Sequence, residues 1–252
     1  MKILSVAVPS IFWEGLDYIA PADFDGPLLP GMRVSVPLAS RKVVGILLSV
    51  KDNSHIDSAK LRHAEAVLDE TPWLNSSLLA LLSWVSEYYH YPIGEVMTTA
   101  LPKAFRQPKA LVCKKPLQKE MHIQFESEHD LTQEQSSALS AIQSASGYHV
   151  FLLDGVTGSG KTEVYMHAIN DCLRGGKQAL LLVPEISLTP QTSQRFMQRF
   201  NVPVLMLHSG LAPVGRLQRW LQVTADVPLI VIGTRSAVFS PFANLGLIVV
   251  DE

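Results

Sequence analysis

The chain has 252 residues, of which 47% are hydrophobic and 17% are charged, and its formal net charge is −2. This composition excludes a disordered chain and supplies a sizeable core, and the length allows one or two domains. Two cysteines, Cys113 and Cys172, exclude a disulfide framework and a zinc site built from paired cysteines. No apolar run approaches the roughly 18–20 residues that span a bilayer, and Pro9 and Glu14 argue against a secretory signal. We therefore expect a soluble, cytoplasmic protein with no membrane partner.

Residues 1–105 are predicted to form a small, mainly β domain. Proline and glycine separate short apolar runs, one of which alternates apolar and polar residues as a half-buried strand does. The runs lie at 3–8, 16–20, 31–37, 43–50 and 64–68. Behind a cap at Asn75 or Ser76, leucines at helical spacing predict a helix over 75–89. Residues 106–130 are polar and mixed in charge, which indicates a linker.

Residues 131–252 show a different pattern, in which apolar runs alternate with helical stretches. Strands are expected at 149–153, 178–183, 204–207, 229–232 and 247–250. Helices are expected at 132–146, 161–174, 190–200 and 213–223. Continuous apolar strands that alternate with helices are typical of a parallel sheet covered on both faces. The fold class is therefore α/β, with a mainly β domain preceding a parallel-sheet lobe.

A phosphate-binding motif, G-x-x-x-x-G-K-[ST], lies between an expected strand and an expected helix. It consists of Gly155, Val156, Thr157, Gly158, Ser159, Gly160, Lys161 and Thr162. Its glycines allow backbone N–H groups to face one phosphate, and the helix N-terminus adds a partial positive charge. We expect these residues to bind ATP, with Lys161 reaching the β- and γ-phosphates and Thr162 binding Mg²⁺. The alternative is a glycine-rich turn without a ligand.

A carboxylate pair, Asp251 and Glu252, ends the last apolar run. A P-loop site needs a carboxylate on the metal side, at the end of a neighbouring strand. We expect Asp251 to hold Mg²⁺, usually through water, and Glu252 to polarise the attacking water, so both are candidate catalytic residues with Lys161. The alternative is a surface pair at the end of a core strand.

Two further segments follow expected strands, and they contain Pro184-Glu185 and Thr234-Arg235. The carboxyl ends of parallel strands form the ligand edge of an open α/β sheet. Side chains and helix N-terminal amides there can hold the phosphates of a single DNA strand. Ordinary turn chemistry is the alternative for both segments.

Gln135 stands three residues after Thr132, the spacing of a helix capping box. The Gln135 amide can also pair with the donor and acceptor edges of adenine. The cap alone is the simpler interpretation unless the fold is a helicase motor.

Taken together, these segments resemble the primosomal replication-restart helicases, a family of superfamily 2. The resemblance lies in residues 131–135, 155–162, 182–191, 207–211, 233–242 and 247–252, and in residues 17–18, 33–37 and 88–94. It implies one RecA-like P-loop lobe over 131–252 and a fork-binding domain over 1–105. It also implies ATP-dependent 3′→5′ unwinding of DNA, with ATP and Mg²⁺ as cofactors. The implied partners are forked and single-stranded DNA, replication-restart proteins and single-strand-binding protein.

The resemblance further implies that the N-terminal domain holds the 3′ end of a DNA strand. The family's pocket uses an aspartate preceded by an aromatic residue, together with a glycine and a lysine. Asp17 matches the aspartate, whereas Leu16, Ala39 and Arg62 stand where the aromatic residue, the glycine and the lysine would be. We expect Asp17 and Arg62 to contact DNA, and we expect the loss of stacking at Leu16 to cost roughly 1–3 kcal/mol.

The sequence lacks several parts that the family pattern includes. Residues 106–130 have no room for a winged helix, and the 252 residues include neither a second motor lobe nor the family's zinc-binding cysteines. We therefore expect an N-terminal fragment with no zinc site. Three functions remain open: a helicase, a module that binds branched DNA and ATP without turnover, and an unrelated P-loop enzyme such as a small-molecule kinase. The segments at 208–211 and 233–237 argue against the kinase, which has no need of them.

Overall fold

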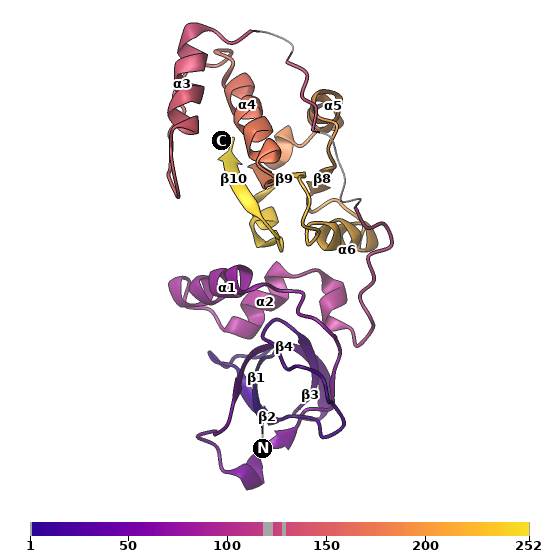
Figure 1. The fold of residues 1–252 in the computed structure, drawn as a ribbon. Helices are drawn as coiled ribbons and strands as arrows, with labels where there is room; N and C mark the ends of the chain where they lie inside the picture. Colours follow the sequence, from indigo (N-terminus) through magenta and orange to yellow (C-terminus); the bar gives the residue numbers. More distant parts are fainter. Residues whose placement is uncertain (1, 118–122, 128–129, 252) are drawn as a thin grey trace. The chain divides into compact units, whose positions relative to one another are not determined.

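The computed structural model describes residues 2–117, 123–127 and 130–251, which divide into two compact units (Figure 1). The first unit comprises residues 1–115, 210–224 and 239–241, and the second comprises residues 116–209, 225–238 and 242–252. Within the described ranges, no helix is both long enough and apolar enough to cross a membrane.

The first unit is built on a sheet of six strands in the order β5-β2-β1-β4-β3-β6. The strands are β1 (Ile3–Ala7), β2 (Leu16–Ile19), β3 (Arg33–Leu38), β4 (Arg41–Lys51), β5 (Arg62–His63) and β6 (Ala66–Val67). β1 pairs antiparallel with both β2 and β4, and Figure 1 shows these strands curled into a ring. Alternate side chains such as Leu4, Val34 and Leu47 are fully buried inside it. The mainly β prediction for this region is confirmed.

A buried arginine ties β3 to two later segments of the chain. Arg33 is fully buried and its Nη2 lies 2.6 Å from Oδ1 of Asp69. Arg33 Nη1 also donates to the carbonyl oxygens of Gln107 and Lys109, at 3.1 and 3.0 Å. The first residues of the predicted linker are therefore held against the sheet by hydrogen bonds.

Two helices follow the sheet, α1 (Ser76–Tyr88) and α2 (Ile93–Ala100). The α1 prediction is confirmed, including its cap: the Asn75 side chain accepts from the N–H of Leu78. The sequence analysis missed α2, which is short and begins after Pro92 without a side-chain cap. Packing of its apolar side chains against the first unit's core stabilises it instead.

Gly94 permits the close approach of α2 to β1. A Cβ atom at this position would lie 1.7 Å from the carbonyl oxygen of Val8, so the backbone would have to move. We expect Gly94→Ala to lower the free energy of unfolding by about 3 kcal/mol, the upper range for overpacking. Urea unfolding monitored by tryptophan fluorescence measures this change.

Gly215 provides the matched control, because a Cβ there meets no atom within 4 Å. It lies in helix α6 (Pro213–Gln222), where alanine is favoured over glycine by about 0.5–1 kcal/mol. Gly215→Ala should therefore stabilise the chain. Equal effects of the two substitutions would contradict the packing described for Gly94.

Helix α6 belongs to the first unit. The Trp220 ring contacts the Phe105 ring edge to face, with centroids 4.8 Å apart, and its indole N–H donates to the carbonyl oxygen of Phe239. Gln218 accepts from the N–H of Lys114 and donates to the carbonyl oxygen of Val112. The Gln218 side chain on α6 therefore holds the backbone of Val112 and Lys114 beside this helix by hydrogen bonds.

The second unit contains a parallel sheet of four strands in the order β10-β7-β9-β8. Its elements are α3 (Gln133–Gln143), α4 (Lys161–Arg174), β7 (Gln178–Leu182), α5 (Pro190–Arg199), β8 (Val204–Leu207), β9 (Ile230–Gly233) and β10 (Leu245–Val250). β7 and β9 lie in the middle and are almost wholly buried, as their continuous apolar runs predict. The parallel α/β prediction is confirmed.

The strand predicted at 149–153 is wrong for this structure. These residues are not paired in either sheet, and Val150, Phe151 and Leu152 are 79%, 47% and 93% exposed. The sheet ends instead at β10, which pairs with β7 alone and exposes Ile248. Hydrophobicity indicated a strand, but a strand also needs a neighbouring backbone, and this segment has none beside it.

Candidate nucleotide and DNA sites

The carboxyl ends of three strands meet at one edge of the parallel sheet. The N–H of Val183 donates to the carbonyl oxygen of Gly233, and the N–H of Asp251 donates to that of Leu182, both at 2.9 Å. This alignment brings five predicted site residues to the same edge: Pro184, Glu185, Thr234, Arg235 and Asp251. The sheet register therefore assembles segments that are far apart in the sequence.

The glycines of the P-loop adopt the conformation that the motif requires. Gly158 and Gly160 have φ values of +82° and +81°, in the left-handed region that side chains disfavour. Gly160 is the N-cap of α4, and no side chain caps the helix there. The first amides of α4 are consequently not blocked by a side-chain cap, and the helix terminus favours an anion.

Lys161 turns back onto its own loop. Its Nζ donates to the carbonyl oxygen of Gly155 at 2.5 Å and to that of Val156 at 3.3 Å. The ammonium group thus lies beside the backbone that is expected to surround a phosphate. Both carbonyl contacts are exposed, so a phosphate can replace them.

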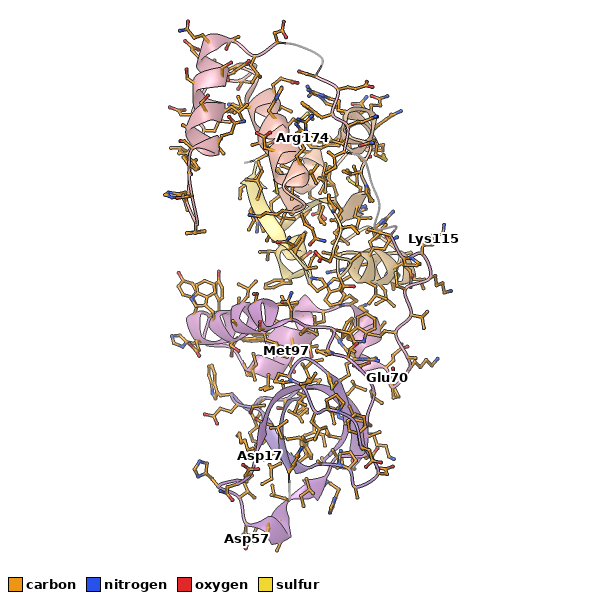
Figure 2. All side chains as sticks on the ribbon, viewed as in Figure 1. Asp17, Asp57, Glu70, Met97, Lys115 and Arg174 are labelled. Carbon is orange, nitrogen blue, oxygen red and sulfur yellow. The ribbon has the colours of Figure 1, made fainter. Side chains whose placement is uncertain are left out.

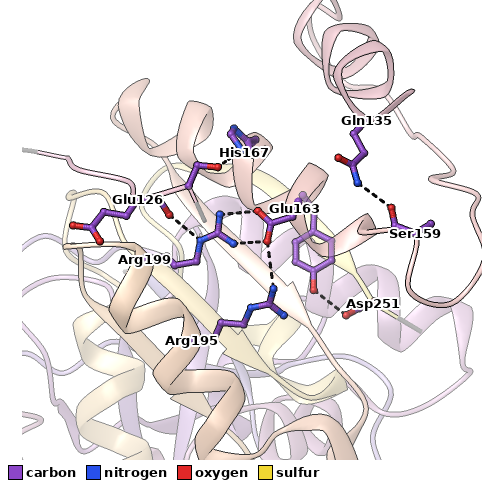
Figure 3. Close-up of polar contacts among 10 residues, drawn as sticks. Glu126, Gln135, Ser159, Glu163, His167, Arg195, Arg199 and Asp251 are labelled. Atoms are coloured by element: carbon purple, nitrogen blue, oxygen red, sulfur yellow. Dashed lines mark hydrogen bonds and ion pairs between the residues drawn. The ribbon is translucent and has the colours of Figure 1, made fainter. Parts of the chain in front are cut away.

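Gln135 completes the predicted capping box and also contacts the P-loop. Its Oε1 accepts from the N–H of Thr132 at 2.9 Å, while the Thr132 hydroxyl accepts from the N–H of Gln135. The Gln135 Nε2 donates to the carbonyl oxygen of Ser159 at 2.9 Å (Figure 3). The cap is confirmed, and adenine recognition stays a prediction.

Tyr165 lies beside both predicted Mg²⁺ ligands. Its hydroxyl donates to Oδ2 of Asp251 at 3.1 Å (Figure 3), and Thr162 lies three residues earlier on the same face of α4. A hydroxyl and a carboxylate are oxygen ligands of the kind Mg²⁺ prefers, so the residues present fit this ion. Glu252, the predicted water-activating residue, lies outside the described residues.

The hydroxyl of Tyr165 remains protonated under physiological conditions. Burial, with a smaller contribution from the charge of Asp251, raises the pKa of Tyr165 to about 12. The phenol therefore acts as a donor to the carboxylate at neutral pH. The sequence analysis missed Tyr165, although its position three residues after Thr162 places both on one face of α4.

A nearly buried ion-pair network joins the start of α4 to α5. Arg199 donates to both carboxylate oxygens of Glu163, at 2.5 and 2.7 Å, and Arg195 reaches Oε1 at 3.3 Å (Figure 3). The hydrogen bond from Arg199 holds the pKa of Glu163 below its usual value. Arg199 also donates to the carbonyl oxygen of Glu126 and lies over the Phe125 ring. The end of the predicted linker is thereby fixed to α5.

In the first unit, Asp17 lies on β2 (Figure 2) and has two side-chain partners. Its carboxylate accepts from Lys51 Nζ at 3.2 Å and from the Ser54 hydroxyl at 2.7 Å. Arg62 instead donates to the carbonyl oxygen of Ala39 at 2.9 Å. The cation bonded to Asp17 is therefore Lys51, which the sequence analysis missed because strand register is not visible in the sequence.

Ala39 and Leu16 occupy positions where the resemblance implied other residue types. Ala39 has a φ of +53°, a left-handed conformation that glycine adopts more easily. Leu16 packs against the apolar interior of the sheet. An open cavity of about 340 Å³ lies beside Ser54, lined by residues 52–58 with Ile3 and Leu61.

Comparisons with known proteins identify a matching family for each half of the chain. Residues 5–102 match the family model of the PriA 3′DNA-binding domain, and residues 132–252 match that of the DEAD/DEAH box helicases. The chain is 34% identical to the replication restart protein PriA of Haemophilus influenzae and 32% identical to that of Rickettsia conorii. Each alignment covers 100% of this chain but only 44% and 37% of the respective relative.

A third relative, the replication restart protein PriA of Bacillus subtilis, is 47% identical over 125 residues. That alignment covers 48% of this chain and 16% of the relative. The chain thus spans less than half the length of the relatives it matches. It belongs to the PriA replication-restart family, of which it carries the N-terminal part.

Proposed function

We propose that the protein acts as an ATP-dependent 3′→5′ DNA helicase of replication-fork restart. Residues 1–105 capture DNA at its 3′ end, residues 106–130 link the two domains, and residues 131–252 bind ATP. The supporting observation is the sheet edge at which the P-loop helix, Asp251 and the two candidate DNA segments meet. The family matches of the two halves support the same division.

Each site residue then has a defined role. The P-loop amides and Lys161 hold the phosphates of ATP, and Thr162 and Asp251 hold Mg²⁺. When bound, Mg²⁺ neutralises charge on the phosphates. Glu252 activates water for hydrolysis. Four residues at the same sheet edge contact the DNA backbone: Pro184, Glu185, Thr234 and Arg235.

The partners proposed for this function are forked DNA and single-stranded DNA. The relatives' name, replication restart protein, supports this choice. We further propose other restart proteins and single-strand-binding protein as partners. We propose a cytoplasmic location, which is where a bacterial replication protein acts. Among the described residues, no group of three His, Cys, Asp or Glu side chains is placed to hold a metal ion.

A second function is binding of branched DNA and ATP without turnover by these 252 residues alone. The described part of the chain contains one parallel sheet and one P-loop motif. Related motors bind ATP between two lobes, and loss of a transition-state arginine supplied across the site lowers the rate by about 10³–10⁵.

DNA-stimulated ATP hydrolysis distinguishes the two functions. We expect the 252-residue chain to bind a forked DNA but to hydrolyse ATP slowly, with little stimulation. Strong stimulation would contradict the non-catalytic function and support a complete motor. Absence of any fork binding would contradict both.

Capture of a 3′ end is tested at Asp17. Its carboxylate is mostly buried and its remaining lone pairs can accept from a terminal 3′-hydroxyl. We expect Asp17→Ala to weaken binding to a fork with a free 3′-hydroxyl by about 13-fold or more, because one hydrogen bond to a charged group contributes about 1.5–3 kcal/mol. Fluorescence anisotropy measures the affinity.

Two controls make this test specific. A fork blocked by a 3′-dideoxynucleotide should bind the variant and the unaltered protein alike, because it has no 3′-hydroxyl to donate to Asp17. Asp25→Ala removes an exposed carboxylate elsewhere in the first unit and should leave both affinities unchanged. Equal weakening for free and blocked ends would refute a role for Asp17 in recognising the hydroxyl.

A further inference from the structure

Tyr165 stands between the two side chains that are expected to hold Mg²⁺. Its hydroxyl donates to Oδ2 of Asp251 at 3.1 Å, and Thr162 lies one helical turn before it on α4. The two expected ligands come from different elements, since Thr162 lies on α4 and Asp251 directly follows β10. No other described side chain is hydrogen-bonded to Asp251.

The Tyr165 ring is held rigidly enough to position Asp251 relative to Thr162. It is 8% exposed and packs in an apolar cluster with Met166, Ile169 and Leu181. Thr162 and Tyr165 share one face of α4, three residues apart, so their separation is fixed by the helix. Asp251 has no such support, because β10 is an edge strand bonded to β7 on one side only.

We propose that Tyr165 is a positioning residue that orients Asp251, together with Thr162, for binding of the Mg²⁺ that accompanies ATP. This inference rests on the proposed binding of ATP and Mg²⁺ at the P-loop. The phenol occupies one lone pair of Oδ2 and leaves the other oxygen, Oδ1, able to face a cation or its water. Hydrogen-bond partners of metal ligands fix ligand orientation in this manner.

The test measures ATP affinity as a function of Mg²⁺ concentration, with a fluorescent ATP analogue and the 252-residue chain. Tyr165→Phe removes the hydroxyl and keeps the buried ring. We expect nucleotide affinity in EDTA to stay the same, while the Mg²⁺ concentration giving half of the affinity gain rises about 10-fold, as for other partners of metal ligands. An unchanged Mg²⁺ dependence would overturn the proposal.

Tyr18→Phe is the matched control, since Tyr18 is likewise buried and donates its hydroxyl to a carbonyl oxygen, that of Pro37, in the first unit. It should not alter the Mg²⁺ dependence. Thermal unfolding without ligand shows whether each variant is folded. A Tyr165→Phe chain whose EDTA affinity fell as much as its Mg²⁺-dependent affinity would contradict a role toward the cation.

A double-mutant cycle shows whether Tyr165 acts through Asp251. In an Asp251→Asn background, Tyr165→Phe should produce little further change, because the oriented carboxylate is already absent. Full additivity of the two substitutions would overturn the proposal. A different result would contradict the proposed function itself. In that case the unaltered chain would bind no ATP with or without Mg²⁺, and the role of Tyr165 would be contradicted as well.

Discussion

Lys161→Ala is expected to weaken ATP binding about 100-fold, which corresponds to about 2.7 kcal/mol. The Lys161 ammonium lies at the P-loop, where it donates to two loop carbonyls that a phosphate can replace. Charge-assisted hydrogen bonds to phosphate are among the stronger ones in proteins, and the variant loses more than one. Equilibrium titration with a fluorescent ATP analogue measures the loss.

Lys177→Ala is the control for this experiment. Lys177 is an exposed cation in the same unit, in the turn after α4, and it does not belong to the P-loop. Its replacement changes the net charge by the same amount and should leave ATP affinity within about twofold. If both variants bound ATP as the unaltered protein does, the P-loop would not be the nucleotide site.

Glu163→Gln is expected to lower the free energy of unfolding by about 3 kcal/mol. The substitution leaves Arg199, which is 2% exposed, without its bidentate carboxylate partner. An uncompensated buried charge is costly because few waters can replace the lost oxygens. Urea unfolding measures the change, and Glu134→Gln on exposed α3 is the control. A loss below about 1 kcal/mol would contradict this expectation, because it is the value typical of a solvent-exposed ion pair.

The same pair predicts a dependence of stability on pH. Arg199 holds the pKa of Glu163 below its ordinary value of 4.5, so the folded state binds this proton less readily than the unfolded state. The contribution of Glu163 is therefore complete above pH 4.5 and is lost as the pH falls through its native pKa. Below pH 4.5 the unaltered protein should lose stability more steeply than Glu163→Gln. Parallel curves for the two proteins would contradict this assignment.

Features set by local spacing were predictable from the sequence. The bounds of α4 follow from the P-loop before it and the Gly175-Gly176 pair after it, and Thr132 and Gln135 form the predicted capping box. The parallel sheet follows from continuous apolar runs, because both faces of such a sheet are covered.

Features that depend on how distant segments pair were not predictable. The hydrogen bond from Tyr165 to Asp251 joins residues 86 positions apart, and that from Lys51 to Asp17 joins residues 34 apart. Neither pairing has a local signal, since each depends on strand register and helix packing. The strand predicted at 149–153 was wrong because apolar residues are a local signal, whereas the pairing of a strand depends on a distant segment of the chain.

The central claim is that the second unit binds ATP with Mg²⁺ at residues 155–162. Hydrogen–deuterium exchange of the unaltered chain, with and without ATP and Mg²⁺, tests it most directly because it locates the ligand along the backbone. We predict slower exchange in peptides covering the P-loop and the first turn of α4, and none of this protection in Lys161→Ala. Protection elsewhere in the chain, with the P-loop unaffected at saturating ATP, would contradict the claim.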